Sequence, residues 1–178
     1  MVLYHGTTGK RAERIFAEGK LKCIVDRHYT PTCSGNGYTE QGYVYLSNEI
    51  LFSILFANCC NLEDHSEELY IFKLDVDDSL LEADYDEMRI QSCPDFIRKK
   101  YKNDLDYSLN ELKSCRVNFD INLRNDKAFY MKINVNKINI KELITHSGCN
   151  LHDTQSNYSV EQKRFIESIQ WERISTDI

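Results

Sequence analysis

The sequence LYHGTT, Leu3 to Thr8, places a histidine and then a glycine in the first segment of the chain that has strand character. A buried strand ordinarily prefers β-branched or aromatic residues at such positions. Glycine weakens a strand and often marks a place where the backbone closely approaches another group. We therefore expect a short strand over residues 3–5 and expect Gly6 to lie against another strand or a small molecule.

The length of 178 residues suits a single domain, residues 1–178, with a hydrophobic core of its own. The formal net charge of −6 argues against a broad nucleic-acid-binding surface. No apolar run approaches the roughly 20 residues that span a membrane, and the N-terminal residues lack the apolar segment of a signal peptide. We expect a cytoplasmic protein without membrane association.

The seven cysteines form no C-x-x-C pair, and Cys59 and Cys60 are adjacent. Adjacent cysteines suit neither an ordinary disulfide nor a tetrahedral zinc site. The acidic run at residues 75–87 lacks the spacing of a calcium-binding loop. We therefore expect reduced thiols and no metal site.

Two segments with apolar residues at helical spacing predict helices at residues 9–18 and 48–60. The expected end residues are Thr7 or Thr8 and then Gly19 for the first helix, and Ser47 or Asn48 at the start of the second. Residues 22–41 between them are polar and contain glycine and proline, which predicts a loop. A loop of this length in a compact domain indicates function.

The rest of the chain mixes strands and helices. The predicted elements are strands at 42–47 and 68–77, one or two helices within 94–114, a strand that turns into a second extended piece at 127–140, and a helix at 159–173 capped by Ser159. Residues 80–91 fit neither pattern clearly. Because the order shows no regular β-α-β alternation, we predict an α+β fold rather than a doubly wound sheet.

Three local patterns occur in a fixed order in the first 60 residues. His-Gly-Thr at residues 5–7 precedes a helix that ends in IFAEGKL, and Gly-Tyr-Val-Tyr-Leu-Ser follows at residues 42–47. Ser53 and Phe56 then lie eight and eleven residues after Tyr45. This order resembles the ADP-ribosyltransferase superfamily, of the diphtheria-toxin and poly(ADP-ribose) polymerase type. The resemblance also takes in the strand at 69–77, and it implies a split antiparallel β-sheet core with flanking helices.

The resemblance implies NAD as a co-substrate and assigns roles to residues that would bind it. His5 would bond the ribose on the adenosine side, and the backbone of Gly6, next to Thr7, would pair with the nicotinamide carboxamide. Tyr45 and Phe56 would cover the two faces of the nicotinamide ring, and Ser53 would bond the carboxamide oxygen. In the first loop, Arg27 is a candidate for the pyrophosphate, because a guanidinium group bonds phosphate in a bidentate manner.

A third catalytic position departs from the family pattern. Many members carry a glutamate on a late strand, and the best match for this position falls at Phe129 or Tyr130, of which we take Tyr130. Neither residue is acidic, so a catalytically inactive NAD- or ADP-ribose-binding module stays open. Mono-transferring relatives often lack this glutamate, and Glu40 or Glu68 could substitute for it.

We therefore expect an NAD-dependent mono-ADP-ribosyltransferase, a glycosyltransferase that passes ADP-ribose to a nucleic acid or a protein. The short chain resembles bacterial or phage toxins and effectors, which implies an antitoxin or inhibitor protein as a further partner. The acceptor would meet residues 22–41 or 93–115. A rival function is that of the RNA 2′-phosphotransferases, which share the fold but require several basic residues at the site, and few lie near the three patterns.

Ordinary packing explains each of these residues when it is taken alone. Tyr43 and Tyr45 alternate as strand aromatics do, and Phe56 suits the core face of a helix. The basic run RKKYK at residues 98–102 suits a solvated helix face better than a nucleic-acid contact. Only a shared cleft would distinguish a site from a set of core residues.

Overall fold

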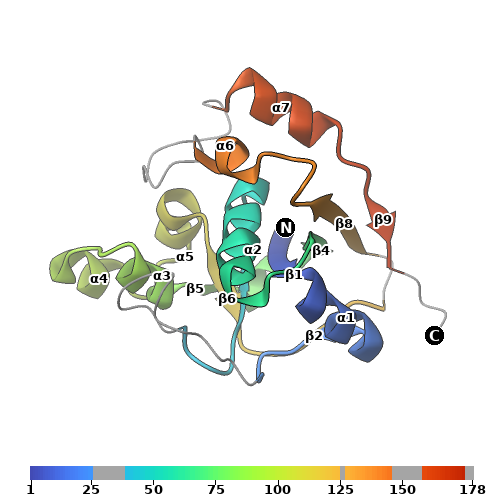
Figure 1. Ribbon diagram of the computed structural model, residues 1–178. Coiled ribbons are helices and arrows are strands. Elements are labelled where there is room, and N and C mark those ends of the chain that lie inside the picture. The colour runs from blue at the N-terminus through green and yellow to red at the C-terminus, as the bar shows by residue number, and fades with distance from the viewer. Residues whose placement is uncertain (26–38, 125–126, 146–157, 175–178) are drawn as a thin grey trace.

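The computed structural model describes residues 1–25, 39–124, 127–145 and 158–174, and it consists of antiparallel sheets with helices packed on them (Figure 1). The elements in chain order are β1 (Val2–Thr8), α1 (Gly9–Glu18), β2 (Lys20–Leu21), β3 (Val44–Leu46), α2 (Ile50–Asp64), β4 (Glu68–Asp75), the 3-10 turn η2 (Asp78–Leu80), β5 (Glu82–Ala83), α3 (Tyr85–Ile90), α4 (Asp95–Tyr101), α5 (Leu105–Tyr107), the π-helical turn η3 (Ser108–Leu112), β6 (Cys115–Val117), β7 (Ile121–Asn122), β8 (Ala128–Asn134), α6 (Ile140–Thr145), α7 (Val160–Glu167) and β9 (Glu172–Arg173). The predicted α+β class with antiparallel sheets and flanking helices is confirmed.

The strands form three antiparallel sheets, in the orders β1-β4-β8-β9, β3-β6-β5 and β2-β7. The first two sheets meet at an isolated bridge between Tyr4 and Ser47. The Tyr4 amide donates to the Ser47 carbonyl at 2.7 Å, and the Ser47 amide donates to the Tyr4 carbonyl at 2.8 Å. This pair of hydrogen bonds places His5 beside Tyr45, although 40 residues separate the two in the chain.

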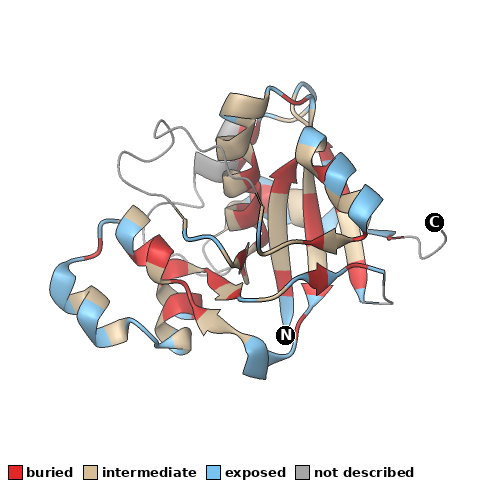
Figure 2. Cartoon of the chain, turned by 90° about the horizontal axis from the view of Figure 1, so that it is seen from below, coloured by how far each residue is buried: buried red, intermediate tan, exposed pale blue. Residues whose placement is uncertain are grey.

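Hydrophobic side chains pack on both faces of the four-stranded sheet, as alternation along the strands requires. On one face, Leu3 and Phe72 join a cluster to which α1 contributes Ala12. On the other face, Ile71 joins a cluster to which α2 contributes Ile54. Figure 2 shows the buried positions on the strands and on the inner faces of the helices. Each fully buried aliphatic side chain contributes about 1.5–3 kcal/mol to folding.

At Gly6, α2 approaches the backbone of β1 closely. A Cβ atom at Gly6 would lie 1.9 Å from the Ser53 carbonyl oxygen and 3.2 Å from the Ala57 Cβ. The close approach expected at this glycine is therefore present, but the partner is a helix backbone and not a strand. The glycine lets Ser53 and its neighbours on α2 sit directly over the first strand.

The predicted ends of the first two helices agree with the structure only in part. Gly19 ends α1 in the left-handed conformation with φ of 68°, as expected. Thr8 is the N-cap residue of α1, as predicted, but its side chain makes no cap hydrogen bond. The N-cap predicted for α2 at Ser47 or Asn48 is wrong, because Glu49 holds that position, also without a side-chain cap hydrogen bond. Thr8 Oγ1 donates instead to Asp64 at 2.6 Å, and the Ser47 hydroxyl donates to the Lys113 carbonyl at 2.6 Å. These side chains join separate elements rather than satisfy their own helix.

The second half of the chain contains more strands than the sequence predicted. β4 and β8 are confirmed, but residues 135–140 form a turn that leads into α6, so the second extended piece is wrong. Residues 80–91 contain β5 and α3, and residues 94–114 contain α4 and α5. Ser159 caps α7 with a complete capping box, as expected, but the helix ends at Glu167 and β9 follows. β5, β6, β7 and β9 are too short for period-two alternation to show in the sequence.

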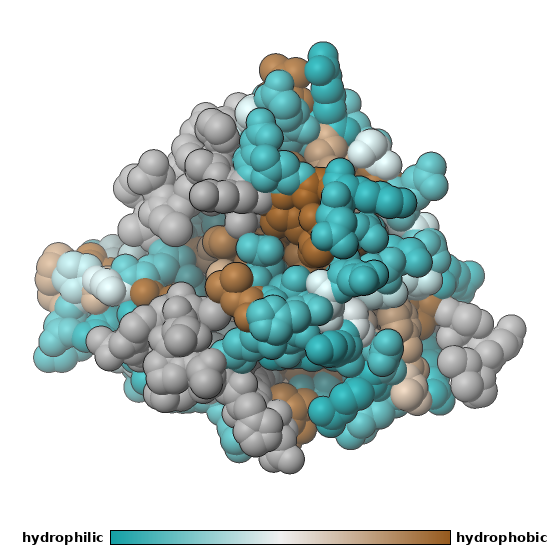
Figure 3. Space-filling view, viewed as in Figure 1, coloured by the Kyte–Doolittle hydropathy of each residue, from teal (hydrophilic) through white to brown (hydrophobic). Residues whose placement is uncertain are grey.

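The surface in the view of Figure 3 is largely hydrophilic, with a patch of hydrophobic side chains between α2 and β8, below α7. Among the described residues, no helix has the length and apolarity needed to cross a membrane. The following described cysteines form no disulfide: Cys23, Cys59, Cys60, Cys93 and Cys115.

We predict that Gly6→Ala lowers the free energy of unfolding by about 3 kcal/mol, because the new methyl group would collide with the α2 backbone. The measurement is urea unfolding followed by circular dichroism. Gly9→Ala is the matched control, since a Cβ at Gly9 meets its nearest atom at 3.3 Å. We expect the control to change stability by less than about 1 kcal/mol. Equal stability of the two variants would contradict the prediction.

Candidate functional site

A cavity of about 450 Å³ opens where β1, β3, α1 and α2 meet. Its lining includes the following residues that the sequence singled out as binding residues: His5, Gly6, Thr7, Tyr45, Ser53 and Phe56. These residues come from three segments of the chain, and the structure brings them to one space. Arg27 lies outside the described residues.

The imidazole of His5 is fixed by a backbone contact. Its Nδ1 lies 2.9 Å from the Tyr45 carbonyl oxygen. Because a carbonyl oxygen only accepts, Nδ1 carries the proton in this contact. This contact fixes the orientation of the half-buried imidazole, which lines the cavity.

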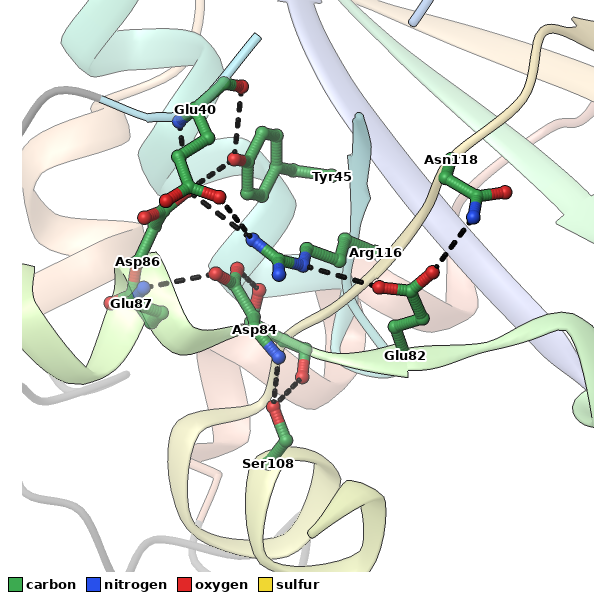
Figure 4. A network of polar contacts seen from close by, with 10 residues as sticks. Glu40, Tyr45, Glu82, Asp84, Asp86, Glu87, Ser108, Arg116 and Asn118 are labelled. Carbon is green, nitrogen blue, oxygen red and sulfur yellow. Dashed lines mark hydrogen bonds and ion pairs between the residues drawn. The ribbon is translucent and has the colours of Figure 1, made fainter. Parts of the chain in front are cut away.

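Tyr45 is held at both ends of its side chain. Its hydroxyl contacts the Asp86 carboxylate and lies 3.1 Å from the Glu40 carbonyl oxygen (Figure 4). The ring packs edge-on against Tyr43, with 6.4 Å between ring centroids. The Arg116 guanidinium lies over the Tyr43 ring at 3.7 Å. The orientation of the Tyr45 ring is therefore set before any ligand enters.

Arg116 organises the carboxylates behind Tyr45. It stands directly opposite Tyr45 in the β3–β6 pair and is close to three acidic residues from different segments. The distances are 3.4 Å to Glu40, 3.8 Å to Glu82 and 3.6 Å to Asp86 (Figure 4). Asp86 is fully buried and also pairs with Arg89, so its charge is compensated within the protein.

Cationic side chains line another part of the cavity. They are Lys10, Arg11 and Arg14 from α1 and Lys20 and Lys22 from β2 and its end. Three of them are paired: Arg11 with Asp64 at 2.6 Å, Lys20 with Asp120 at 2.8 Å, and Lys22 with Glu18 at 2.7 Å. Neither Lys10 nor Arg14 has a carboxylate within ion-pair distance in the described part of the chain. The expectation that few basic residues lie near the site is wrong, because α1 and β2 both turn basic positions toward the cavity.

Two buried carboxylates, Asp84 and Glu87, line the cavity as well, and the sequence analysis did not identify them. They are only 2% and 4% exposed. Asp84 is the N-cap of α3, where it accepts the Glu87 amide at 2.9 Å, and it also accepts the Ser114 hydroxyl at 2.5 Å. An aspartate three residues before a glutamate at a helix start was the available signal. This pair lies within residues 80–91, which fitted neither the helix pattern nor the strand pattern in the sequence.

Burial shifts the titration of both carboxyl groups. Desolvation raises the pKa of Asp84 to about 6, although hydrogen bonds from Ser114 and the Glu87 amide oppose the shift. Desolvation, with the nearby charge of Asp84, raises the pKa of Glu87 to about 8. A carboxyl group that titrates near neutral pH can accept or release a proton under physiological conditions.

Tyr130 does not reach this cavity. It lies on β8, in the sheet of β1, whereas the strand that pairs with the Tyr45 strand is β6. The Tyr130 hydroxyl donates to Glu172 at 2.5 Å, which raises the tyrosine pKa to about 12. The late strand nearest to Tyr45 was not recognised in the sequence because it has only three residues.

The two alternative glutamates lie elsewhere too. Glu40 is engaged behind Tyr45 with Arg116, and Glu68 on β4 accepts the Tyr70 hydroxyl at 3.1 Å. Neither belongs to the lining of the cavity. Across the described ranges, no group of three or more His, Cys, Asp or Glu side chains could hold a metal ion.

Comparison of the chain with protein-family models, with curated proteins and with solved structures gives no match. The function is therefore inferred from the residues of the cavity and from their geometry.

We predict that the free energy of unfolding falls by on the order of 3 kcal/mol as pH rises from about 5 to about 8, because Glu87 loses its proton in the folded state only near the upper end of this range. An unfolded glutamate titrates near pH 4.3, so between that pH and about 8 the folded state holds more protons than the unfolded state. Glu87→Gln removes this titration, and the free energy of unfolding of the variant should change less with pH. Urea unfolding at several pH values measures the slope.

Asp120→Asn is the control for this slope. Lys20 lowers the pKa of Asp120 to about 2, so the group is ionised in both states throughout this pH range. Its replacement should shift stability equally at pH 5 and pH 8. A Glu87→Gln variant that keeps the full wild-type slope would contradict the assignment of the titration to Glu87.

Proposed function

We propose that this protein is an NAD-dependent mono-ADP-ribosyltransferase that cleaves the nicotinamide–ribose bond and transfers ADP-ribose to a macromolecule. The observation that carries the proposal is the convergence of His5, Tyr45, Ser53 and Phe56 on one cavity. These residues were selected from the sequence by their order and spacing, and ordinary packing does not require them to share a space. A cavity of about 450 Å³ lies within the size range of small-molecule and cofactor sites.

The chemistry of the lining fits the nicotinamide end of NAD. The rings of Tyr45 and Phe56 can stack on the nicotinamide, which is worth on the order of 1 kcal/mol beyond burial. The Ser53 hydroxyl and the Gly6 backbone supply polar partners for the carboxamide. The imidazole of His5, held in a defined orientation, suits a hydrogen bond to a ribose hydroxyl group.

The cationic part of the lining fits the diphosphate. Lys10 and Arg14 bring positive charge to the cavity without a described carboxylate as partner. Phosphate oxygens are favoured partners of such side chains. The role proposed for Arg27 in the sequence is therefore also available to residues of α1.

The reaction develops positive charge on the ribose as the bond to nicotinamide breaks. The electron pair of that bond passes to the ring nitrogen, and nicotinamide leaves as a neutral molecule. The site would act by holding the two ends of NAD in a fixed relation and by placing polar groups around the developing charge. We propose a nucleic acid or a protein as acceptor, a toxin or effector role, and an antitoxin or inhibitor protein as a partner.

A second candidate is the NAD-dependent transfer of a 2′-phosphate from RNA. The basic residues of α1 and β2 favour it, because such an enzyme must hold an RNA phosphate beside NAD. The two functions differ in one requirement. A phosphotransferase releases nicotinamide only when a 2′-phosphorylated RNA is present, and a plain RNA or a protein does not replace it.

We predict that the protein binds NAD and releases nicotinamide, and that His5→Ala lowers the release at least about 100-fold, because the oriented imidazole is lost. Tyr45→Ala should weaken NAD binding about 10-fold through loss of stacking, whereas Tyr45→Phe keeps the ring and should bind NAD within about 3-fold of wild type. Chromatography measures release, and calorimetry measures binding.

His65→Asn is the control, because His65 is exposed at the end of α2 and lies outside the cavity. NAD binding without turnover in any lysate would indicate an inactive binding module, and an absence of NAD binding would refute the proposal. Labelled NAD in a lysate, followed by separate digestion with protease, DNase and RNase, identifies the class of acceptor by the treatment that frees the label.

We predict that the double variant Lys10→Gln, Arg14→Gln weakens ADP-ribose binding about 10-fold, because two charges that can face the diphosphate are lost. Nicotinamide binding should stay unchanged, since the rings and Ser53 are intact. Lys163→Gln, an exposed lysine on α7 away from the cavity, is the charge-matched control for each substitution. Equal loss of affinity for nicotinamide and ADP-ribose would contradict a separate diphosphate region.

A further inference from the structure

We propose that Glu87 is the general base of the cavity, which takes the proton from the acceptor group that attacks the ribose. This inference rests on the proposed function and names the carboxylate that the late strand does not supply. The acceptor is then a group with an O–H or N–H bond.

The hydrogen bonding of Glu87 leaves one carboxylate oxygen available to the cavity. Oε1 accepts the Gln91 side chain at 2.7 Å. Among the described residues, no donor reaches Oε2, and no cation lies within ion-pair distance of the carboxylate. The side chain is nevertheless 96% removed from solvent, since its exposed fraction is 4%, and it lines the cavity.

The contrast with Asp86, one residue earlier, indicates that this arrangement is not a structural ion pair. Asp86 is also buried, but it receives Arg89, the Tyr45 hydroxyl and the Glu40 amide, the last at 2.8 Å. Burying a carboxylate without such partners costs free energy. Glu87 has a single neutral donor, so stability alone gives no reason for a carboxylate at this position, whereas proton transfer in the cavity does.

Asp84 holds Glu87 in place and is a positioning residue. Its carboxylate accepts the Glu87 amide at 2.9 Å and the Ser114 hydroxyl at 2.5 Å, and its own amide donates to Ser108 at 2.8 Å (Figure 4). These bonds tie the start of α3 to the segment around β6. The Glu87 side chain therefore projects from a fixed helix start.

The charged and titratable groups around Glu87 come from several elements. Asp84 and Asp86 precede it, and its charge also acts on the Cys93 thiol after α3. His5 and Tyr45 line the same cavity, and Arg116 on β6 pairs with Asp86 at 3.6 Å. The nearest charges, Asp84 and Asp86, are negative and raise the pKa of Glu87 together with desolvation. A base whose pKa lies near the working pH is efficient in proton transfer.

One bond forms and one bond breaks in the transfer. The acceptor oxygen or nitrogen forms a bond to the anomeric carbon of the ribose, and the bond from that carbon to nicotinamide breaks. The electron pair goes to the pyridinium nitrogen, which makes nicotinamide neutral. The proton of the acceptor group goes to the Glu87 carboxylate and then to solvent.

Glu87→Gln tests the proposal, with NAD binding, nicotinamide release and transfer to the lysate acceptor as separate readouts. We expect NAD affinity within about 3-fold of wild type and transfer at least about 100-fold slower. The rise of the wild-type transfer rate with pH, from deprotonation of the base, should be absent in the variant. Glu82→Gln is the control, because Glu82 belongs to the same polar network but lies outside the cavity.

Two outcomes would overturn the proposal. The first is transfer by Glu87→Gln within about 3-fold of wild type, and the second is a parallel loss of transfer and NAD affinity, which indicates a structural role. If Glu87→Gln does not fold, the Glu87→Asp variant tests the proposal instead. The shorter side chain should slow transfer about 10-fold with unchanged NAD affinity and a retained pH dependence, and wild-type transfer would overturn the proposal.

The same measurements distinguish a failure of the proposed function from a failure of the proposed general base. A wild-type protein that neither binds NAD nor releases nicotinamide refutes the transferase itself. An active wild type with an equally active Glu87→Gln refutes the base alone.

Discussion

The close approach of α2 to β1 at Gly6 is the constraint on which the rest of the structure depends. The Ser53 carbonyl occupies the space where any other residue would carry its Cβ, so the helix lies against the strand backbone. Ser53 and Phe56 then share a space with His5 on the adjacent strand. The hydrogen bonds between Tyr4 and Ser47 bring the second sheet to the same place and add Tyr45. A single missing side chain thus determines the distance between the elements that form the cavity.

The cavity combines three kinds of lining, each from a different part of the chain. Aromatic and small polar groups come from β3 and α2, cationic groups from α1 and β2, and buried carboxylates from the start of α3. The buried charges differ in whether an opposite charge neutralises them. Asp86 and Arg116 neutralise each other behind Tyr45 and fix its ring, whereas Glu87 stays uncompensated beside the cavity. Low solvent access strengthens every electrostatic interaction in such a space.

Local sequence patterns predicted the first half of the chain well. The helix of residues 9–18, its glycine end, the strand around Tyr45 and the helix that carries Ser53 depend on periodicity and on φ preferences, which neighbouring residues determine. The side-chain caps failed because Thr8 and Ser47 bond to residues 56 and 66 positions away in the chain. Such long-range bonds leave no local signal.

The sequence by itself determined the α+β class, the main early elements and a group of residues suited to one site, because these follow from side-chain type and spacing. Tertiary structure alone decided that His5, Tyr45, Ser53 and Phe56 share a cavity, since their convergence depends on how sheets and helices pack. Tertiary structure also decided which acidic residues line the cavity, namely Asp84 and Glu87. Short strands such as β6 gain their stability from pairing and not from their own sequence pattern, so only the fold could place Arg116 beside Tyr45. The fold likewise brings Asp84 and Glu87 to the cavity, whereas Tyr130 lies outside it.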